Sequence, residues 1–311
     1  MRLRYVTLRL ALMVPSLLVV FSLTFFLMHA TPGGPWDGSS SRPLPASVVE
    51  RLNEVYGLDE PVWQQYLTYL GNIFTEGSLG VSFSRSGQGV TEVVGRTLPV
   101  SLQLGMVAIA MALVVGIALG VISALNRNTL TDRLASLFSI IGVSTPNYVA
   151  ASLLVIVFAV TLGWLPTGGW EGLTSVNILV PAAALALHPM ALLARYTRAS
   201  MLEVWNTDYI RVARSKGLRE RTILVRHGLP NALIPVTTVA GVAFAEVVTG
   251  SFFVEVITSQ PGIGRYFVES IFARDYPVIL GTTLVYALIV MTMNLVVDIL
   301  YTFLDPRVTY E

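Results

Sequence analysis

The chain alternates between long stretches without charged residues and short polar segments. Residues free of Asp, Glu, Lys and Arg occupy 10–36, 97–126, 134–170, 172–194, 227–245 and 276–297. A helix needs about 20 apolar residues to cross the hydrocarbon core of a bilayer, and each run is close to or beyond that length. The pattern predicts an all-α polytopic membrane protein whose six transmembrane helices lie near 6–28, 99–124, 134–162, 178–196, 231–253 and 277–304.

Composition agrees with a membrane-embedded chain and excludes several kinds of chemistry. Of the 311 residues 54% are hydrophobic and 13% are charged, whereas soluble domains have about 25% charged residues. The net charge of +1 provides no basic field for nucleic acid. The absence of cysteine excludes thiolate catalysis and iron–sulfur clusters. The single lysine, Lys216, is followed by Gly217, so a phosphate-binding P-loop cannot form, and the three histidines lack metal-site spacing.

Basic residues are distributed unevenly between the two sides of the predicted spans. With a cytoplasmic N-terminus, the cytoplasmic segments hold 14 of the 20 Lys and Arg residues. The outer segments hold the other six, namely Arg42, Arg51, Arg85, Arg96, Arg265 and Arg274. The positive-inside rule therefore predicts that both termini are cytoplasmic. The first apolar stretch exceeds the roughly 7–15 residues of a cleaved signal peptide, which favours a retained signal anchor.

The predicted spans divide the chain into three parts. Residues 1–30 form an N-terminal tail and the first transmembrane helix, residues 31–96 an extracytoplasmic segment, and residues 97–311 a core with helices 2–6. The segment 31–96 begins with turn-forming Pro, Gly and Ser residues, and helical spacing predicts short helices near 46–56 and 62–74. This segment is either a substrate-contacting domain or a structural cap.

A cytoplasmic loop at 197–230 separates the fourth and fifth predicted spans. Its residues 205–218 are typical of a short helix, with Asn206 or Thr207 as the N-cap and Asp208 near the positive end of the helix dipole. Gly217 is suited to a left-handed C-terminal turn. A second helix is expected at 220–226.

One face of the first of these helices carries Ile210, Ala213 and Gly217, bordered by Arg214. A small flat face on a projecting helix favours docking into a groove on another protein. The alternative is that the bases of the loop only satisfy the positive-inside rule.

The sequence of this loop resembles the "EAA" loop of permease subunits in binding-protein-dependent ABC importers. Ala213, Gly217, Leu229 and Pro230 match that pattern, and residues 211, 212 and 227 hold Arg, Val and His in place of its Glu, first Ala and Ile. Further motifs resemble the B-type permease of oligopeptide, dipeptide and nickel importers. They include Gly-Val-Ser-Phe at 80–83, Gln-Pro-Gly-Ile-Gly at 260–264, Arg-Asp-Tyr-Pro at 274–277 and Asn-Leu-Val-Val-Asp at 294–298.

The resemblance implies a six-helix permease of the bacterial or archaeal cytoplasmic (inner) membrane. Its implied partners are a second, homologous permease, two cytoplasmic ABC ATPase subunits and an extracytoplasmic solute-binding protein. It also implies that this chain is not an enzyme and binds no cofactor, since ATP and Mg belong to the ATPases. The residues expected to couple to the ATPases are Asp208, Tyr209, Arg211, Val212, Ala213, Lys216 and Gly217. Peptides are the expected substrate, with nickel chelates or oligosaccharides as alternatives.

Ionisable residues within membrane spans usually face the bundle interior or water. Glu246 in the fifth span could line the translocation path or bond to a neighbouring helix, and Asp298 in the sixth favours the structural role. The sequence Ser-Thr-Pro-Asn at 144–147 is predicted to kink the third span, where Pro146 and Asn147 either form a gate beside the translocation path or only bend the helix. An ion-driven secondary transporter would require a repeated half and several central charges, and an intramembrane enzyme would require a catalytic motif; neither feature is found.

Overall fold

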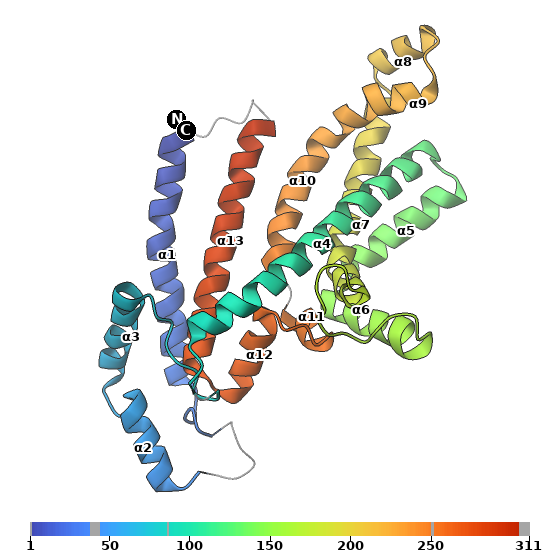
Figure 1. Cartoon of the computed structure of the whole chain (residues 1–311). Helices are drawn as coiled ribbons and strands as arrows, with labels where there is room; N and C mark the ends of the chain where they lie inside the picture. The colour runs from blue at the N-terminus through green and yellow to red at the C-terminus, as the bar shows by residue number, and fades with distance from the viewer. Residues whose placement is uncertain (1, 38–43, 86, 250–251, 305–311) are drawn as a thin grey trace. The chain divides into compact units, whose positions relative to one another are not determined.

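The computed structural model describes residues 2–37, 44–85, 87–249 and 252–304 (Figure 1). Within these ranges the chain forms helices and loops, and one isolated β-bridge joins Val81 to Gly89. The predicted all-α fold class is confirmed. The α-helices are α1 (Arg2–Ala30), α2 (Ala46–Tyr56), α3 (Val62–Glu76), α4 (Val90–Leu125), α5 (Leu130–Ser144), α6 (Asn147–Leu154), α7 (Leu179–Trp205), α8 (Asp208–Ser215), α9 (Glu220–Ile223), α10 (Leu229–Thr249), α11 (Phe252–Ile257), α12 (Ile263–Ala273) and α13 (Tyr276–Leu304).

Three shorter turns complete the described elements, and the whole divides into two compact units. The turns are the π-helical η1 (Val155–Thr161) and η3 (Leu224–Gly228) and the 3-10 turn η2 (Val176–Ile178). Among the described residues, the N-terminal unit comprises Arg2–Ser101 and Gln260–Met291, and the central unit comprises Leu102–Ser259 and residues 292–304. Helices α4 and α13 each contribute residues to both units.

An aromatic core holds the N-terminal unit together. Phe21 and Phe25 of α1 are buried against Leu280 of α13, and the Phe21 ring stacks on Tyr69 of α3 with centroids 5.6 Å apart. Helices α2 and α3 lie where the sequence predicts helices near 46–56 and 62–74. Each ends at a glycine with positive φ, Gly57 at 65° and Gly77 at 62°, as expected because glycine adopts left-handed backbone without steric strain.

Helix α7 forms the centre of the central unit. In its most apolar 18-residue window 61% of residues are buried, compared with 33% in α4 and 11% in α1. Glycines allow neighbouring helices to approach it closely, as the sequence predicts for 116–120. A Cβ atom on Gly116 would lie 2.7 Å from the Met190 carbonyl oxygen, and one on Gly120 would lie 2.5 Å from the Thr197 Cβ.

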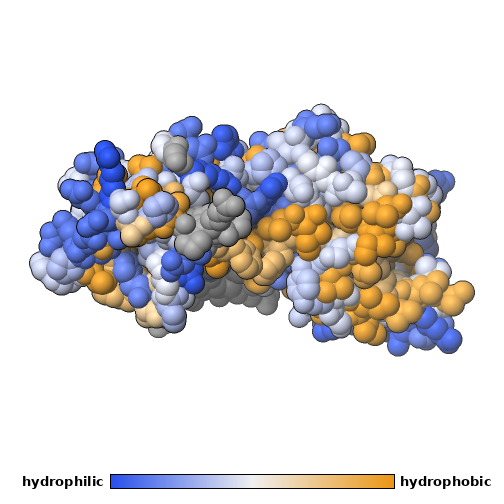
Figure 2. All heavy atoms as spheres, turned by 90° about the horizontal axis from the view of Figure 1, so that it is seen from below, coloured by the Kyte–Doolittle hydropathy of each residue, from blue (hydrophilic) through white to orange (hydrophobic). Residues whose placement is uncertain are grey.

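The described residues include four helices long and apolar enough to cross a membrane, or five when one bent pair is counted as a span. The four are within α1, α4, η2–α7 and α13. Many large hydrophobic side chains are exposed, and in Figure 2 hydrophobic residues gather over one part of the visible face while the rest is largely hydrophilic. The predicted span at 231–253 coincides with α10 and α11, but residues 250–251 lie outside the described residues, and the count of six spans stays a prediction.

The third predicted span, 134–162, is not one kinked helix. Helix α5 and the segment Asn147–Thr161, formed by α6 and η1, differ in direction by 113°, and the break falls at the predicted site, Pro146. Pro146 has no N–H to continue α5, and its ring forces the residue before it into extended backbone. Thr145 accordingly has φ −91° and ψ 119°. The sequence located the break correctly and underestimated the bend, so this segment is a broken span or a re-entrant loop.

Candidate functional site

Helix α8 projects with α9 at one end of the central unit, beyond α7 and α10 (Figure 1). Its first turn contains Asp208, whose carboxylate pairs with Arg211 at 2.5 Å, and both side chains are largely exposed. Thr207 is at the N-cap position, but its side chain does not cap α8. The Thr207 hydroxyl instead donates to the Val204 carbonyl oxygen at 2.6 Å, which closes the end of α7. The predicted position of the helix start is correct and the predicted capping bond is wrong.

Gly217 closes the other end of α8 in left-handed backbone, as predicted. Its φ is 73°, the Gly217 N–H donates to the Arg214 carbonyl, and the Leu218 N–H donates to the Ala213 carbonyl. This pair of bonds is the Schellman arrangement, which satisfies carbonyl groups that the helix leaves open. A Cβ atom on Gly217 would meet nothing within 4 Å of the chain. Within this chain, glycine is therefore favoured at position 217 by the left-handed backbone conformation and not by a lack of space for a side chain.

Two of the three residues on the small-residue face of α8, Ile210 and Ala213, pack inward against α9 and α7, whereas Gly217 is exposed. Ile210 is 0% exposed and Ala213 is 6% exposed, and both contact Ile223 of α9 together with Val204 and Trp205 of α7. An apolar face on a helix of eight residues must be covered by something, and α9 returns the chain close enough to cover it.

The outward face of α8 combines apolar and charged side chains. Tyr209 is 42% exposed and Val212 is 52% exposed. The exposed residues of this helix and its C-terminal turn are Asp208, Tyr209, Arg211, Val212, Arg214, Ser215, Lys216 and Gly217. Six of the seven residues predicted to couple to the ATPases are therefore accessible, and Ala213 is the exception.

Trp205 fixes α8 and α9 to the transmembrane helices. Its ring lies over Gly228, where an added Cβ atom would come within 2.5 Å of the Trp205 Cζ3. The Arg214 guanidinium lies 5.4 Å from the Trp205 ring centroid and donates to Glu220 at 2.8 Å. The expected helix at 220–226 is shorter than predicted, because α9 gives way to the π turn η3, which leads directly into α10. These contacts make α8 a supported projection and not an isolated loop.

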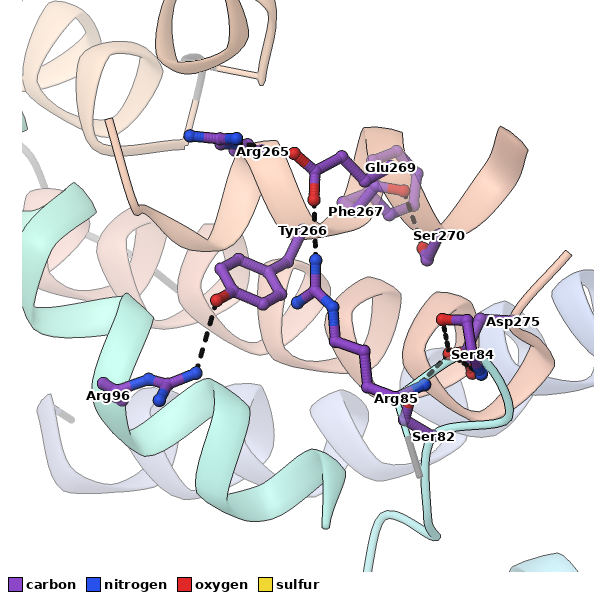
Figure 3. Close-up of polar contacts among 10 residues, drawn as sticks. All are labelled: Ser82, Ser84, Arg85, Arg96, Arg265, Tyr266, Phe267, Glu269, Ser270 and Asp275. Carbon is purple, nitrogen blue, oxygen red and sulfur yellow. Dashed lines mark hydrogen bonds and ion pairs between the residues drawn. The ribbon is translucent and has the colours of Figure 1, made fainter. Parts of the chain in front are cut away.

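The N-terminal unit has a second polar cluster, around Asp275 (Figure 3). This buried carboxylate accepts hydrogen bonds from the Ser82 and Ser84 hydroxyls, at 2.5 and 2.7 Å, and from the backbone N–H groups of Phe83 and Ser84. It thereby fixes the turn near residues 81–89 to the start of α13. The sequence motifs at 80–83 and 274–277 meet here, which sequence reasoning did not predict.

Arginines surround this cluster on its more exposed side. Arg85 and Arg265 both pair with Glu269, at 2.7 and 2.6 Å, and the Arg85 guanidinium lies 4.1 Å from the Tyr266 ring centroid (Figure 3). Arg96 donates to the Tyr266 hydroxyl at 3.3 Å. Each member of the two ion pairs is more than a third exposed, so solvent weakens both pairs.

Tyr69 attaches α3 to the same part of the unit. Its hydroxyl donates to the Leu79 carbonyl at 2.6 Å. Burial, with a smaller contribution from the negative charge of Asp275, raises the pKa of the Tyr69 phenol, so the hydroxyl remains protonated and remains a donor.

The residues predicted to line a translocation path lie on different elements of the central unit. Pro146 is exposed and Asn147 half-buried at the break between α5 and α6, and Glu246 is exposed on α10. Asp298 is half-buried on α13. Their part in a path stays a prediction.

Several apolar helices and a supported projecting helix define a polytopic membrane protein. Residues 2–105 match the N-terminal model of the binding-protein-dependent transport system membrane component, and residues 116–310 match that of the binding-protein-dependent transport system inner membrane component. The chain belongs to this family of inner-membrane permease subunits.

Full-length relatives support the assignment. The chain is 44% identical to the dipeptide transport system permease protein DppB of Bacillus subtilis, over 98% of this chain and 97% of that protein. It is 39% identical to the oligopeptide transport system permease protein OppB of Haemophilus influenzae, over 99% and 100%. Among solved structures, a chain of the inward-facing MetNI methionine ABC transporter matches with a TM-score of 0.58 and 18% identity, covering 69% of this chain and 97% of that one. This last similarity concerns the fold alone.

Proposed function

We propose that this chain is a transmembrane permease subunit of an ATP-driven, binding-protein-dependent importer of di- or oligopeptides. It forms half of the translocation path, and a second, homologous permease forms the other half. The observation that carries the proposal is helix α8, which projects from the transmembrane helices, is attached to them through Trp205 and Gly228, and presents an exposed mixed face. The names of the full-length relatives support the peptide substrate.

In this proposal the outward face of α8 enters a groove on a cytoplasmic ABC ATPase. Tyr209 and Val212 supply the apolar contact, and Asp208, Arg211 and Lys216 supply charges around it. Ala213 acts from beneath, because its packing on Ile223 holds the helix in place. Gly217 keeps α8 short and turns the chain toward α9.

The mechanism follows from that contact. Two ATPase subunits bind ATP and Mg and close on each other, which moves α8, and the attached helices α7 and α10 follow as rigid elements. The path then opens alternately to the outside and to the cytoplasm. The permease itself binds no cofactor and catalyses no reaction.

Orientation is supported by charge. The segments around α8 and around the turn that joins α4 to α5 hold ten of the twenty Lys and Arg residues: Arg127, Arg133, Arg195, Arg198, Arg211, Arg214, Lys216, Arg219, Arg221 and Arg226. The positive-inside rule assigns this end to the cytoplasm, with both termini on the same side. The segment 31–96 is then extracytoplasmic and available to a solute-binding protein that delivers the substrate.

Purification and transport test the proposal together. The tagged chain is expected to bring down two ATPase subunits and a second permease, and the reconstituted complex is expected to import peptide only when binding protein and ATP are both supplied. Import by the chain alone, driven by an ion gradient without ATP, would establish a secondary transporter instead. Uptake of a nickel chelate or an oligosaccharide, with peptides excluded, would retain the importer and change its substrate.

A matched pair of variants tests the part assigned to α8. Val212→Glu places a second negative charge beside Asp208 on the exposed face and is expected to release the ATPases while the permease stays in the membrane. Arg195→Gln changes an exposed arginine of α7 and is expected to leave the complex intact. Retention of both ATPases by the Val212→Glu chain would reject this face as the contact.

A further inference from the structure

A buried carboxylate joins three parts of the central unit near the end that carries α8. Asp132, in the first turn of α5, is 4% exposed. Its Oδ1 accepts from the Ser123 hydroxyl of α4 at 2.5 Å and from Arg198 Nε of α7 at 2.7 Å. Its Oδ2 accepts from the Asn128 N–H at 2.9 Å and from an Arg198 terminal nitrogen at 2.8 Å. The four bonds connect α4, the turn after it, α5 and α7.

The geometry of this pair restricts motion in a way that a single ionic contact does not. A guanidinium that donates two parallel hydrogen bonds to one carboxylate fixes both the distance between the two groups and their relative orientation. Each Asp132 oxygen also accepts one bond from the α4 side, so the carboxylate cannot turn with Arg198 without breaking a bond to Ser123 or Asn128.

Close helix contacts surround the pair. A Cβ atom on Gly120 of α4 would lie 3.0 Å from the Arg198 backbone nitrogen, and one on Gly142 of α5 would lie 2.7 Å from the Ala191 Cβ of α7. Small residues at these points let the three helices pack backbone against backbone. The ion pair therefore closes one end of a helix packing that is already tight.

The same end of α7 leads directly to α8. Arg198 precedes Trp205 by seven residues, or about 10 Å along the helix axis, and Trp205 packs over Gly228 and beside α8. Between these two positions Met201 is buried against Ala124 of α4 and Ala232 of α10. A continuous series of contacts thus runs from α8 through α7 to the start of α5.

We propose that Asp132 and Arg198 are positioning residues that lock α4, α5 and α7 into one lever, so that a displacement of α8 reaches the break between α5 and α6 undiminished. The inference rests on the proposed function, because it assumes that an ATPase moves α8. Neither residue touches the substrate or the ATPase in this role. Their action is to prevent α7 from sliding past α4 and α5 when α8 is pushed.

The burial of Asp132 favours this role over simple stabilisation, and the Arg198 side chain that covers it is 30% exposed. Replacing a buried ion pair by well-packed apolar residues is often neutral or stabilising, so such a pair is an inefficient source of stability. The Asp132–Arg198 pair instead restricts the helices to one arrangement, because a displaced Arg198 would leave the buried Asp132 without its counter-charge. A lever requires that property.

The test uses the complete importer in proteoliposomes with Arg198→Lys, Asp132→Asn and the double variant Asp132→Asn/Arg198→Gln. Lysine keeps the charge of Arg198 but cannot donate the two parallel bonds. We expect each variant to retain its ATPases and their basal rate, while the ATP hydrolysed per peptide imported rises about tenfold, since couplings between sites span about 5- to 150-fold. The double variant is expected to be no worse than Asp132→Asn, because both changes remove the same contact. The controls are Arg133→Gln, next to Asp132, and Arg195→Gln, three residues before Arg198; both arginines are exposed, and these variants should leave the ratio unchanged.

A distance measurement keeps the inference testable if transport falls for another reason. The chain contains no cysteine, so Arg127→Cys and Arg219→Cys introduce two labels, one on the α4–α5 turn and one beside α8, in a complex whose other subunits lack cysteine. With Arg198 present, their separation should stay the same in the nucleotide-free and ATP-bound complexes. With Arg198→Lys it should shift or broaden on ATP binding.

The outcomes separate the two proposals. If the wild-type chain brings down no ATPase, the proposed function fails. If the wild-type importer works and the single variants keep the normal ratio of ATP to peptide, or lose abundance and thermal stability with the ratio unchanged, Asp132 and Arg198 have no positioning role. A label separation that changes with ATP as much in the wild type as in Arg198→Lys would overturn the lever in the same way.

Discussion

Asp132 in the central unit and Asp275 in the N-terminal unit are both buried carboxylates that accept serine hydroxyls and backbone N–H groups, but they differ in what they join. Asp275 receives neutral donors from the turn near residues 81–89 and fixes that turn to the start of α13. Asp132 adds a bidentate arginine from another helix. Neutral hydroxyl and N–H donors are therefore enough to hold a loop in place. A guanidinium that donates two hydrogen bonds joins helices that, in our proposal, move as one body.

Removing the Asp275 carboxylate should have the largest effect on stability. Asp275→Ala leaves several buried donors without an acceptor, each costing about 1–3 kcal/mol, so we expect the free energy of unfolding to fall by at least about 3 kcal/mol. Limited proteolysis should then cut near residues 81–89. Asp59→Ala, an exposed acid in the same unit, is the control. Normal protease resistance in Asp275→Ala would show that the Asp275 carboxylate does not hold this turn in place.

Filling the space under Trp205 should come next. Gly228→Ala places a methyl group 2.5 Å from the Trp205 ring, and overpacking of this kind costs about 1–3 kcal/mol. We expect displacement of α8, loss of ATPase binding and little peptide uptake. The double variant Gly228→Ala/Trp205→Leu should recover binding because the smaller side chain makes room. Full ATPase binding by Gly228→Ala alone would contradict the support assigned to Trp205.

Gly217 offers a graded test of backbone conformation at the end of α8. Left-handed backbone costs an ordinary residue about 1–2 kcal/mol, and Asn tolerates it better. Transport should therefore decrease in the order Gly217, Gly217→Asn, Gly217→Ala. Gly217→Trp adds bulk at the proposed ATPase contact and should abolish uptake while leaving the permease in the membrane. Normal uptake by Gly217→Trp would count strongly against an ATPase contact here.

The smallest effect is expected where the ion pair is exposed. Glu269→Gln disrupts the bonds to Arg85 and Arg265, yet pairs of this exposure contribute about 0–1 kcal/mol. We expect thermal stability to change within that range and the change to diminish with added salt. If Glu269→Gln lost as much stability as Asp275→Ala, then exposure to solvent would not explain the difference between the Glu269 ion pairs and the buried Asp275 hydrogen bonds.

The positions of the four long apolar helices within α1, α4, η2–α7 and α13 could be predicted from sequence, because charge is excluded from lipid and that exclusion marks the ends of the apolar runs. The turn at Gly217 could also be predicted, because a glycine that follows a short helix commonly adopts the left-handed backbone conformation that ends it. Pro146 marked where a helix must stop, but a proline does not state the direction of the next helix. That direction depends on packing against α7, which a local pattern does not contain.

The inward face of α8 and the Asp132–Arg198 pair could not be predicted for a different reason. The spacing of Ile210 and Ala213 identifies an apolar face, but the same spacing fits a partner's groove and the chain's own α9. Asp132 and Arg198 are 66 residues apart, and each alone resembles a charge at the edge of a span. Thr207 shows the same limit at short range. Its hydroxyl could either cap α8 or bond to the end of α7, and it donates to the Val204 carbonyl of α7.

The π turn η3 has a consequence for chain length. A π turn closes hydrogen bonds over one residue more than an α turn, so it amounts to a single inserted residue accommodated within a helix. Deleting one residue from 224–227, with Gly228 kept beneath the Trp205 ring, would convert it into ordinary helix and leave the rotational phase of α10 unchanged. A change of one residue in the length of this turn would therefore leave the direction of α8 unchanged.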